Sequence, residues 1–85
     1  MPYEYKEQRS RIFTDEGQRM FLQIRDRVKK LIKLAGAVRM QEAINGTSGD
    51  GWEMLACVDR MVELGELHEV TAPDECGQYR IFAEA

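Results

Sequence analysis

Cysteine is scarce in this chain. Its 85 residues contain only Cys57 and Cys76, which are too few and too far apart in the sequence for the disulfide framework of a small secreted protein. We therefore expect two free thiols in a reducing compartment.

Long apolar runs are also absent. No stretch approaches the ~18 apolar residues that a helix needs to cross a bilayer, and the first residues, Met-Pro-Tyr-Glu-Tyr-Lys, lack the apolar centre of a secretory signal. We expect a cytoplasmic protein that makes no membrane contact. The chain is long enough for a single core only.

Cysteine and histidine, the usual zinc ligands, are scarce. Cys57, His68 and Cys76 do not form the close ligand pairs of zinc sites, and no third group marks Cys57 and His68 as a nucleophilic pair. The sequence therefore predicts no catalytic residue, no metal ligand and no cofactor. We expect a binding protein rather than an enzyme.

Charge is divided unequally along the chain. Residues 1–45 contain ten Lys or Arg against six Asp or Glu, a net charge of +4, whereas residues 46–85 contain two against nine, a net charge of −7. This asymmetry bears on which part of the protein is able to meet a polyanion.

The N-terminal half is expected to form an arm and a long helix. Residues 1–13 show no helical pattern and predict a partly ordered arm before the domain of residues 14–85. Either its Ile12 and Phe13 close over the first helix, or its aromatic residues pack on a partner subunit. Thr14 is a plausible N-cap, and Gly36 ends the helix. The inward stripe consists of Met20, Phe21, Ile24, Val28, Leu31, Ile32 and Ala35.

A second and a third helix are predicted next. A short strand at Ala37 and Val38 precedes a helix over residues 39–44, and a turn follows. Asp50 with Glu53 satisfies a capping box for a helix that stops at Gly65. Its inward stripe comprises Trp52, Leu55, Val58 and Val62, which leaves Glu53, Cys57, Asp59, Arg60 and Glu63 on the outer faces. Trp52 is either part of this core or an exposed interface anchor.

The C-terminal residues predict a hairpin. Residues 66–70 and 78–83 have strand character, and the loop between them contains Pro73 and Gly77.

This arrangement resembles the winged-helix superfamily. The resemblance rests on Met40-Gln-Glu-Ala-Ile44 as second helix, on Leu64-Gly-Glu-Leu67 after the third helix, and on the hairpin of residues 66–83, and it covers residues 14–83. It implies an α+β fold, a small winged helix-turn-helix with three helices and a C-terminal two-stranded β-hairpin wing.

Most winged-helix proteins bind DNA by placing the third helix in the major groove. Carried onto this chain, the resemblance implies base contacts from Ser48, Asp50, Trp52, Glu53, Cys57 and Arg60 and wing contacts from Glu69, Thr71, Asp74, Glu75 and Arg80. These residues are mostly acidic, whereas phosphate contacts and base readout depend on Arg, Lys, Asn and Gln. The third helix is therefore expected to be repelled by DNA.

The leading hypothesis is a small non-catalytic regulator or adaptor that acts through protein–protein contacts, with either another protein or a second copy of the chain as its partner. The candidate partner-binding residues are Trp52, Glu53, Cys57 and Arg60. The alternative is a DNA-binding transcriptional regulator whose basic first helix contacts the DNA backbone. The candidate contacts to nucleic acid or to an acidic partner are Arg19, Arg25, Lys29, Lys30, Lys33 and Arg39.

Overall fold

The longest element of the computed structural model is the predicted first helix, α2 (Asp15–Ala35). The Thr14 hydroxyl caps it by accepting a hydrogen bond from the Gly17 amide at 3.0 Å. Gly36 closes it with a left-handed φ of 81°, a conformation that glycine adopts without a Cβ clash. Both predicted ends of this helix are confirmed. The structure describes residues 3–47, 49–70 and 79–85.

The chain enters α2 through two short helical elements, α1 (Tyr5–Gln8) and the 3-10 helix η1 (Arg9–Phe13). The expectation of a partly ordered arm therefore differs from the structure over these residues. Ile12 has no exposed surface, so the expectation that Ile12 closes over the helix is confirmed, whereas the same expectation for Phe13 is wrong because Phe13 is 49% exposed. Elements this short show no periodic apolar stripe, which is why the sequence pattern did not reveal them.

After α2 the elements are β1 (Ala37–Arg39), α3 (Met40–Ile44), α4 (Gly51–Glu63), β2 (Leu67–Glu69) and β3 (Ile81–Glu84). Asp50 caps α4, since its Oδ1 accepts the amides of Trp52 at 2.8 Å and Glu53 at 3.2 Å. The described part of the chain thus contains four α helices instead of the predicted three, because α1 precedes the long helix.

The strands form one antiparallel sheet in the order β1-β3-β2. Val38 pairs with Phe82 on one side of β3, and His68 pairs with Ala83 on the other. The prediction of a strand at Ala37 and Val38 is confirmed, so the sheet has three strands where the predicted wing had two. The loop predicted for residues 71–77 lies outside the described residues.

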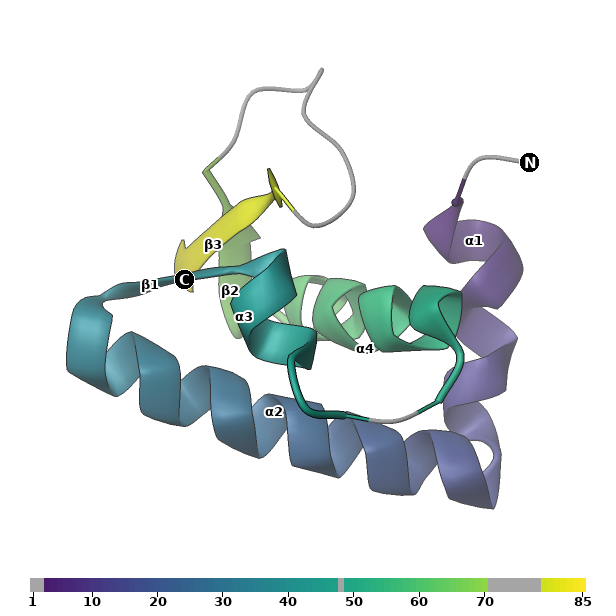
Figure 1. The fold of residues 1–85 in the computed structure, drawn as a ribbon. Coiled ribbons are helices and arrows are strands. Elements are labelled where there is room, and N and C mark those ends of the chain that lie inside the picture. The colour runs from purple at the N-terminus through teal and green to yellow at the C-terminus, as the bar shows by residue number, and fades with distance from the viewer. Residues whose placement is uncertain (1–2, 48, 71–78) are drawn as a thin grey trace.

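The core lies between α2, α4 and the sheet, as Figure 1 shows. Ile24 and Val28 of α2, Val58 and Met61 of α4, and Phe82 of β3 are almost completely buried. The fold is therefore a small α+β arrangement in which the two longest helices and the sheet share one core.

Gly17 marks the closest approach of two backbones in this fold. A Cβ at this position would lie 2.7 Å from the Ile12 carbonyl oxygen and closer still to that of Arg11. The Arg11 carbonyl also accepts a hydrogen bond from the Thr14 hydroxyl at 3.0 Å. The absence of a side chain at residue 17 is what allows η1 to fold back onto the start of α2.

Candidate interaction surfaces

The acidic side chains of α4 are paired with groups elsewhere in the same chain. Glu63 accepts hydrogen bonds from the Tyr5 hydroxyl at 2.7 Å, from Arg9 Nε at 2.9 Å and from Arg60 Nη1 at 2.6 Å. These donors, Tyr5 first and then the two arginines, lower the pKa of the Glu63 carboxyl from 4.5 to about 2. The negative charge of Glu63 is therefore neutralised by hydrogen-bond donors of the same chain.

This pairing predicts a pH effect on stability. The pKa of Glu63 is lowered by folding, so its charged form stabilises the protein above about pH 4.5, and this contribution is lost as the pH falls toward about 2. We expect the urea-unfolding midpoint of the wild type to fall more steeply over this interval than that of Glu63→Gln. Parallel pH profiles of the two proteins would contradict the assignment.

A second acid, Asp59, belongs to a largely buried network. Arg80 from the strand side bridges Asp59 at 2.7 Å and Glu69 at 2.8 Å, and the Tyr3 hydroxyl donates to Asp59 Oδ2 at 2.6 Å. The side chains of Arg80 and Asp59 are only 14% and 12% exposed. Burial, together with the hydrogen bond to Asp59, raises the pKa of Tyr3 above its ordinary value, so Tyr3 stays a hydrogen-bond donor. The network links the N-terminal segment, α4 and the hairpin.

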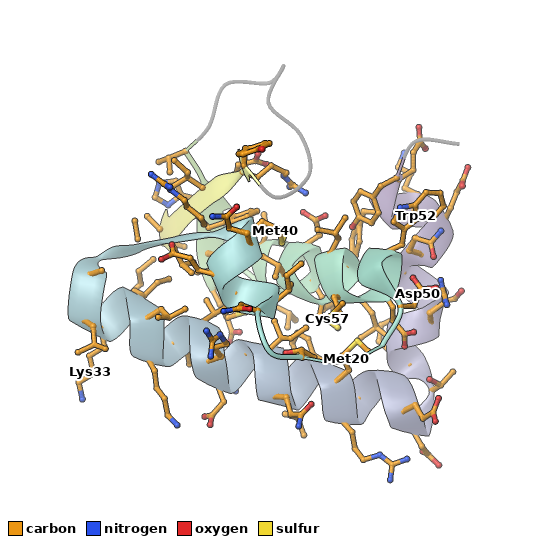
Figure 2. All side chains as sticks on the ribbon, viewed as in Figure 1. Met20, Lys33, Met40, Asp50, Trp52 and Cys57 are labelled. Carbon is orange, nitrogen blue, oxygen red and sulfur yellow. The ribbon has the colours of Figure 1, made fainter. Side chains whose placement is uncertain are left out.

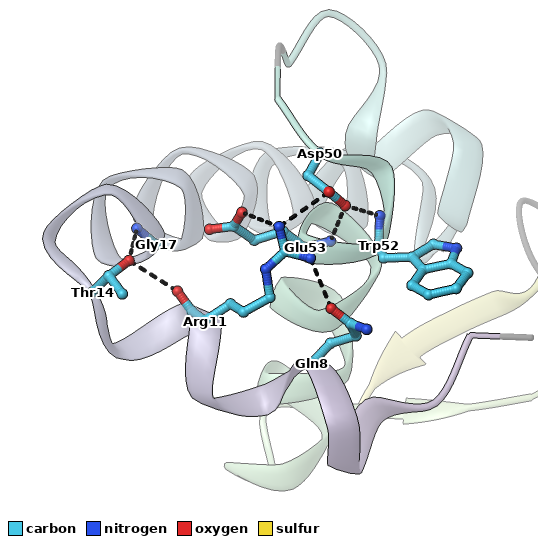
Figure 3. Close-up of polar contacts among 7 residues, drawn as sticks. All are labelled: Gln8, Arg11, Thr14, Gly17, Asp50, Trp52 and Glu53. Carbon is cyan, nitrogen blue, oxygen red and sulfur yellow. Dashed lines mark hydrogen bonds and ion pairs between the residues drawn. The ribbon is translucent and has the colours of Figure 1, made fainter. Parts of the chain in front are cut away.

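The start of α4 is held by a third arginine (Figure 3). Arg11 Nη2 lies 3.0 Å from Asp50 and 3.6 Å from Glu53, and Arg11 Nη1 donates to the Gln8 side chain at 2.8 Å. The pKa of Asp50 is lowered by the hydrogen bond from Arg11 and by the backbone amide of Glu53. Glu53 is the residue that the capping-box pattern places three positions after Asp50. In the structure its carboxylate also lies beside Arg11.

Residues 3–13 consequently pack along α4 and engage its acidic side chains. Ala56, near the middle of this helix, has no exposed surface. Contacts from α1, η1, α2 and α3 surround the helix. Trp52 and Glu63 are the α4 residues with side chains in the exposed class.

The candidate partner-binding residues of α4 are not gathered on one open face. The prediction that Cys57 lies on an outer face is wrong, because its side chain is completely buried, and burial raises the pKa of its thiol to about 12. The fourth candidate, Arg60, packs its guanidinium over the Phe13 ring at 5.2 Å and pairs with Glu63. Helices on several sides of α4 widen its buried stripe until it includes residue 57.

Trp52 is the exception among these candidates. It is 37% exposed, so the interpretation that placed it in the core is wrong. As the second residue of α4 it lies in the first turn of the helix. Figure 3 shows its indole ring turned away from the side chains of Arg11 and Asp50. Trp52 is therefore available as an interface anchor, the second reading of its sequence position.

The basic residues predicted along α2 separate into two groups. Arg25 is engaged with Glu66 at 2.6 Å, and Lys29 lies 3.8 Å from the same carboxylate. Lys30 is 76% exposed and lies 3.7 Å from Asp26. The remaining members of the predicted set, Arg19, Lys33 and Arg39, are also exposed.

The outward face of α2 also carries exposed apolar side chains. Leu22 is 57% exposed and Leu34 is 85% exposed. Figure 2 shows Lys33 and the side chains along this helix projecting away from α4 and the sheet. Neither leucine was among the predicted site residues. Their sequence positions could have indicated this, because both leucines fall outside the inward stripe of α2. They are also separated by a multiple of four residues, which places them on one side of the helix.

Ser48, Thr71, Asp74, Glu75 and Cys76, which the winged-helix resemblance or the cysteine analysis singled out, lie outside the described residues. Among the helices in the described ranges, none has both the length and the apolar character of a bilayer span. Comparison of the chain with protein-family models, with curated proteins and with solved structures finds no match.

Proposed function

We propose that this protein is a non-catalytic winged-helix module that acts as a regulator or adaptor through protein–protein contacts. The observation that carries the proposal is the packing of residues 3–13 along α4. The acidic side chains of this helix are engaged by Tyr3, Tyr5, Arg9 and Arg11 of the same chain, which leaves fewer of them to contact bases.

The winged-helix part of the proposal is supported by the order of the elements. A helix, a short strand, two helices and two further strands follow one another from Asp15 to Glu84, and β3 lies between β1 and β2 in the sheet. In this reading α4 is the third helix, and the β2–β3 hairpin is the wing. Because folds of this kind serve many functions, the surface decides what is bound.

Two exposed surfaces are suited to a protein partner. One is the outward face of α2, which combines Leu22 and Leu34 with charges of both signs. The other is the surface around Trp52 in the first turn of α4. Apolar and aromatic anchors surrounded by polar side chains are typical of protein interfaces.

The alternative function, binding of the DNA backbone, is favoured by exposed lysines and arginines of α2 and β1. Lys30, Lys33 and Arg39 are exposed and do not require α4 to enter a groove. Against it stand Asp26 beside Lys30 and Glu66 beside Lys29, which reduce the positive charge available to phosphates.

Fluorescence anisotropy of a labelled mixed-sequence duplex tests the proposal. The purified chain is titrated at ~50 mM salt and again at higher salt, because phosphate contacts weaken steeply as salt rises. We expect no binding at either salt concentration. Salt-sensitive binding that disappears in a Lys30→Glu, Lys33→Glu double variant with wild-type circular dichroism would overturn the proposal in favour of the DNA alternative.

A further inference from the structure

Four exposed residues of α2 form a ridge along its outward face. Leu22, Asp26, Lys30 and Leu34 follow one another at intervals of four residues, and such i, i+4 rows form the ridges that pack between helices. The leucines are 57% and 85% exposed, and the Asp26 and Lys30 side chains are 75% and 76% exposed. We call these four residues the α2 ridge.

The α2 ridge lies opposite the buried side of its helix. Its midpoint falls at the level of Val28, which has no exposed surface and points into the core. Because residues two positions apart lie on nearly opposite sides of a helix, Asp26 and Lys30 project directly outward from that level. Asp26 and Lys30 form an ion pair with each other at 3.7 Å, and the charge of Asp26 also acts on Arg25.

The chemistry of the α2 ridge is self-complementary under a two-fold rotation. Read in one direction it is apolar, acidic, basic, apolar, and reversal exchanges the acid with the base while leaving the leucines in place. An antiparallel second copy therefore sets Leu22 against Leu34 and Asp26 against Lys30, and each pair occurs twice. A parallel copy sets Asp26 against Asp26 and Lys30 against Lys30, which is unfavourable.

We propose that the partner of the outward face of α2 is a second copy of this chain, docked antiparallel through the α2 ridge. This inference rests on the proposed function, since it names the partner of one of its two surfaces. Interdigitated i, i+4 ridges give a helix crossing angle of about −50°. Of the flanking cations, Arg27 donates to the Glu42 carbonyl at 2.7 Å and Lys29 lies 3.8 Å from Glu66, whereas Arg19 and Lys33 are exposed.

A pocket next to the α2 ridge and the weak ion pair within the ridge both fit this docking mode. A surface pocket beside Leu22 is lined by Arg19, Gln23, Arg25 and Asp26, and it offers a place for the protruding Leu34 of the second copy. The exposed Asp26–Lys30 pair within each chain is worth little in water. Asp26 and Lys30 are therefore able to leave each other and pair with Lys30 and Asp26 of the second copy. The leucines on both sides reduce solvent access to these new pairs.

Sedimentation equilibrium of the whole chain over a wide concentration range tests the pairing. Two crossed helices bury less than the ~1,600 Å² of a standard interface, so we expect a reversible dimer with a dissociation constant on the order of micromolar. Leu34→Asp should raise that constant by about 100-fold. Val70→Asp is the matched control, since Val70 is 54% exposed and directly follows β2. It should leave the constant unchanged.

Charge exchange tests the antiparallel register. Asp26→Lys alone and Lys30→Asp alone should each weaken self-association by at least about 10-fold, because each places like charges across the axis. Mixing the two variants should restore a dimer, and the double exchange Asp26→Lys, Lys30→Asp should dimerise as the wild type does. Circular dichroism verifies that each variant is folded.

The outcomes separate this inference from the proposed function. A wild-type chain that stays monomeric at millimolar concentration, or single exchanges that dimerise as the wild type does, would overturn the pairing. Either result would leave the proposed protein-binding function untouched, because that proposal is overturned by salt-sensitive duplex binding instead.

Discussion

Gly17→Ala should destabilise the protein by roughly 1–3 kcal/mol, the usual cost of overpacking a closely packed site. The new Cβ would lie 2.7 Å from the Ile12 carbonyl oxygen, and the neighbouring atoms are backbone rather than a flexible side chain. Relief requires η1 to move away from α2, and Ile12 would then leave the core. The expected readout is a large fall in the urea-unfolding midpoint.

Gly51→Ala is the matched control for this prediction. Gly51 is also in the first turn of a helix, but a Cβ there meets nothing within 4 Å, and its φ is not in the left-handed region. Alanine should therefore stabilise the protein by about 0.4–1 kcal/mol by reducing the freedom of the unfolded chain. If the two substitutions shifted the midpoint equally and in the same direction, the close backbone contact at Gly17 would be refuted.

Arg80→Met should cost about 3–5 kcal/mol, the usual cost of removing one partner of a buried ion pair. The change leaves Asp59, which is 12% exposed, without the guanidinium that donates to both of its oxygens. It also removes the ion pair of Arg80 with Glu69 and the contact of the guanidinium with the Phe82 ring at 5.0 Å. Methionine keeps most of the side-chain volume, so the loss reports the charge.

Lys30→Met supplies the comparison for Arg80. Lys30 is 76% exposed, and its pair with Asp26 spans 3.7 Å. Exposed pairs contribute about 0–1 kcal/mol, so we expect a shift near the measurement error in a dilute sample, in which the chain is monomeric. Chemical denaturation of both variants distinguishes a buried network from a surface contact. A loss of less than ~1 kcal/mol for Arg80→Met would show that Asp59 is solvated.

The sequence predicted those parts of the fold that depend on local signals. The caps at Thr14 and Asp50 and the stop at Gly36 are encoded within a few residues of the helix ends, and all three are present. The strand at Val38 was also predicted. The helical state of residues 5–13 depends on docking against α4, so no local pattern indicated it.

The candidate site was less predictable because its properties arise from distant pairs. Counting charges indicated that α4 is acidic, yet Arg9 lies 54 positions before its partner Glu63, and Arg11 lies 39 positions before Asp50. Cys57 and Trp52 were misplaced because the helical pattern fixes one buried stripe, whereas the burial of α4 depends on which elements surround it. Spacing alone does not contain that information.

The pairing of the N-terminal segment with α4 also has a consequence for the order of synthesis. Tyr3 and Tyr5 precede their partners Asp59 and Glu63 by 56 and 58 positions. At a ribosomal rate of about 5–20 residues per second, the segment waits roughly 3–12 s before those partners are made. During this interval Ile12 has no α4 to pack against. Residues 3–13 are therefore made before α4 but reach their final positions only once α4 has been completed.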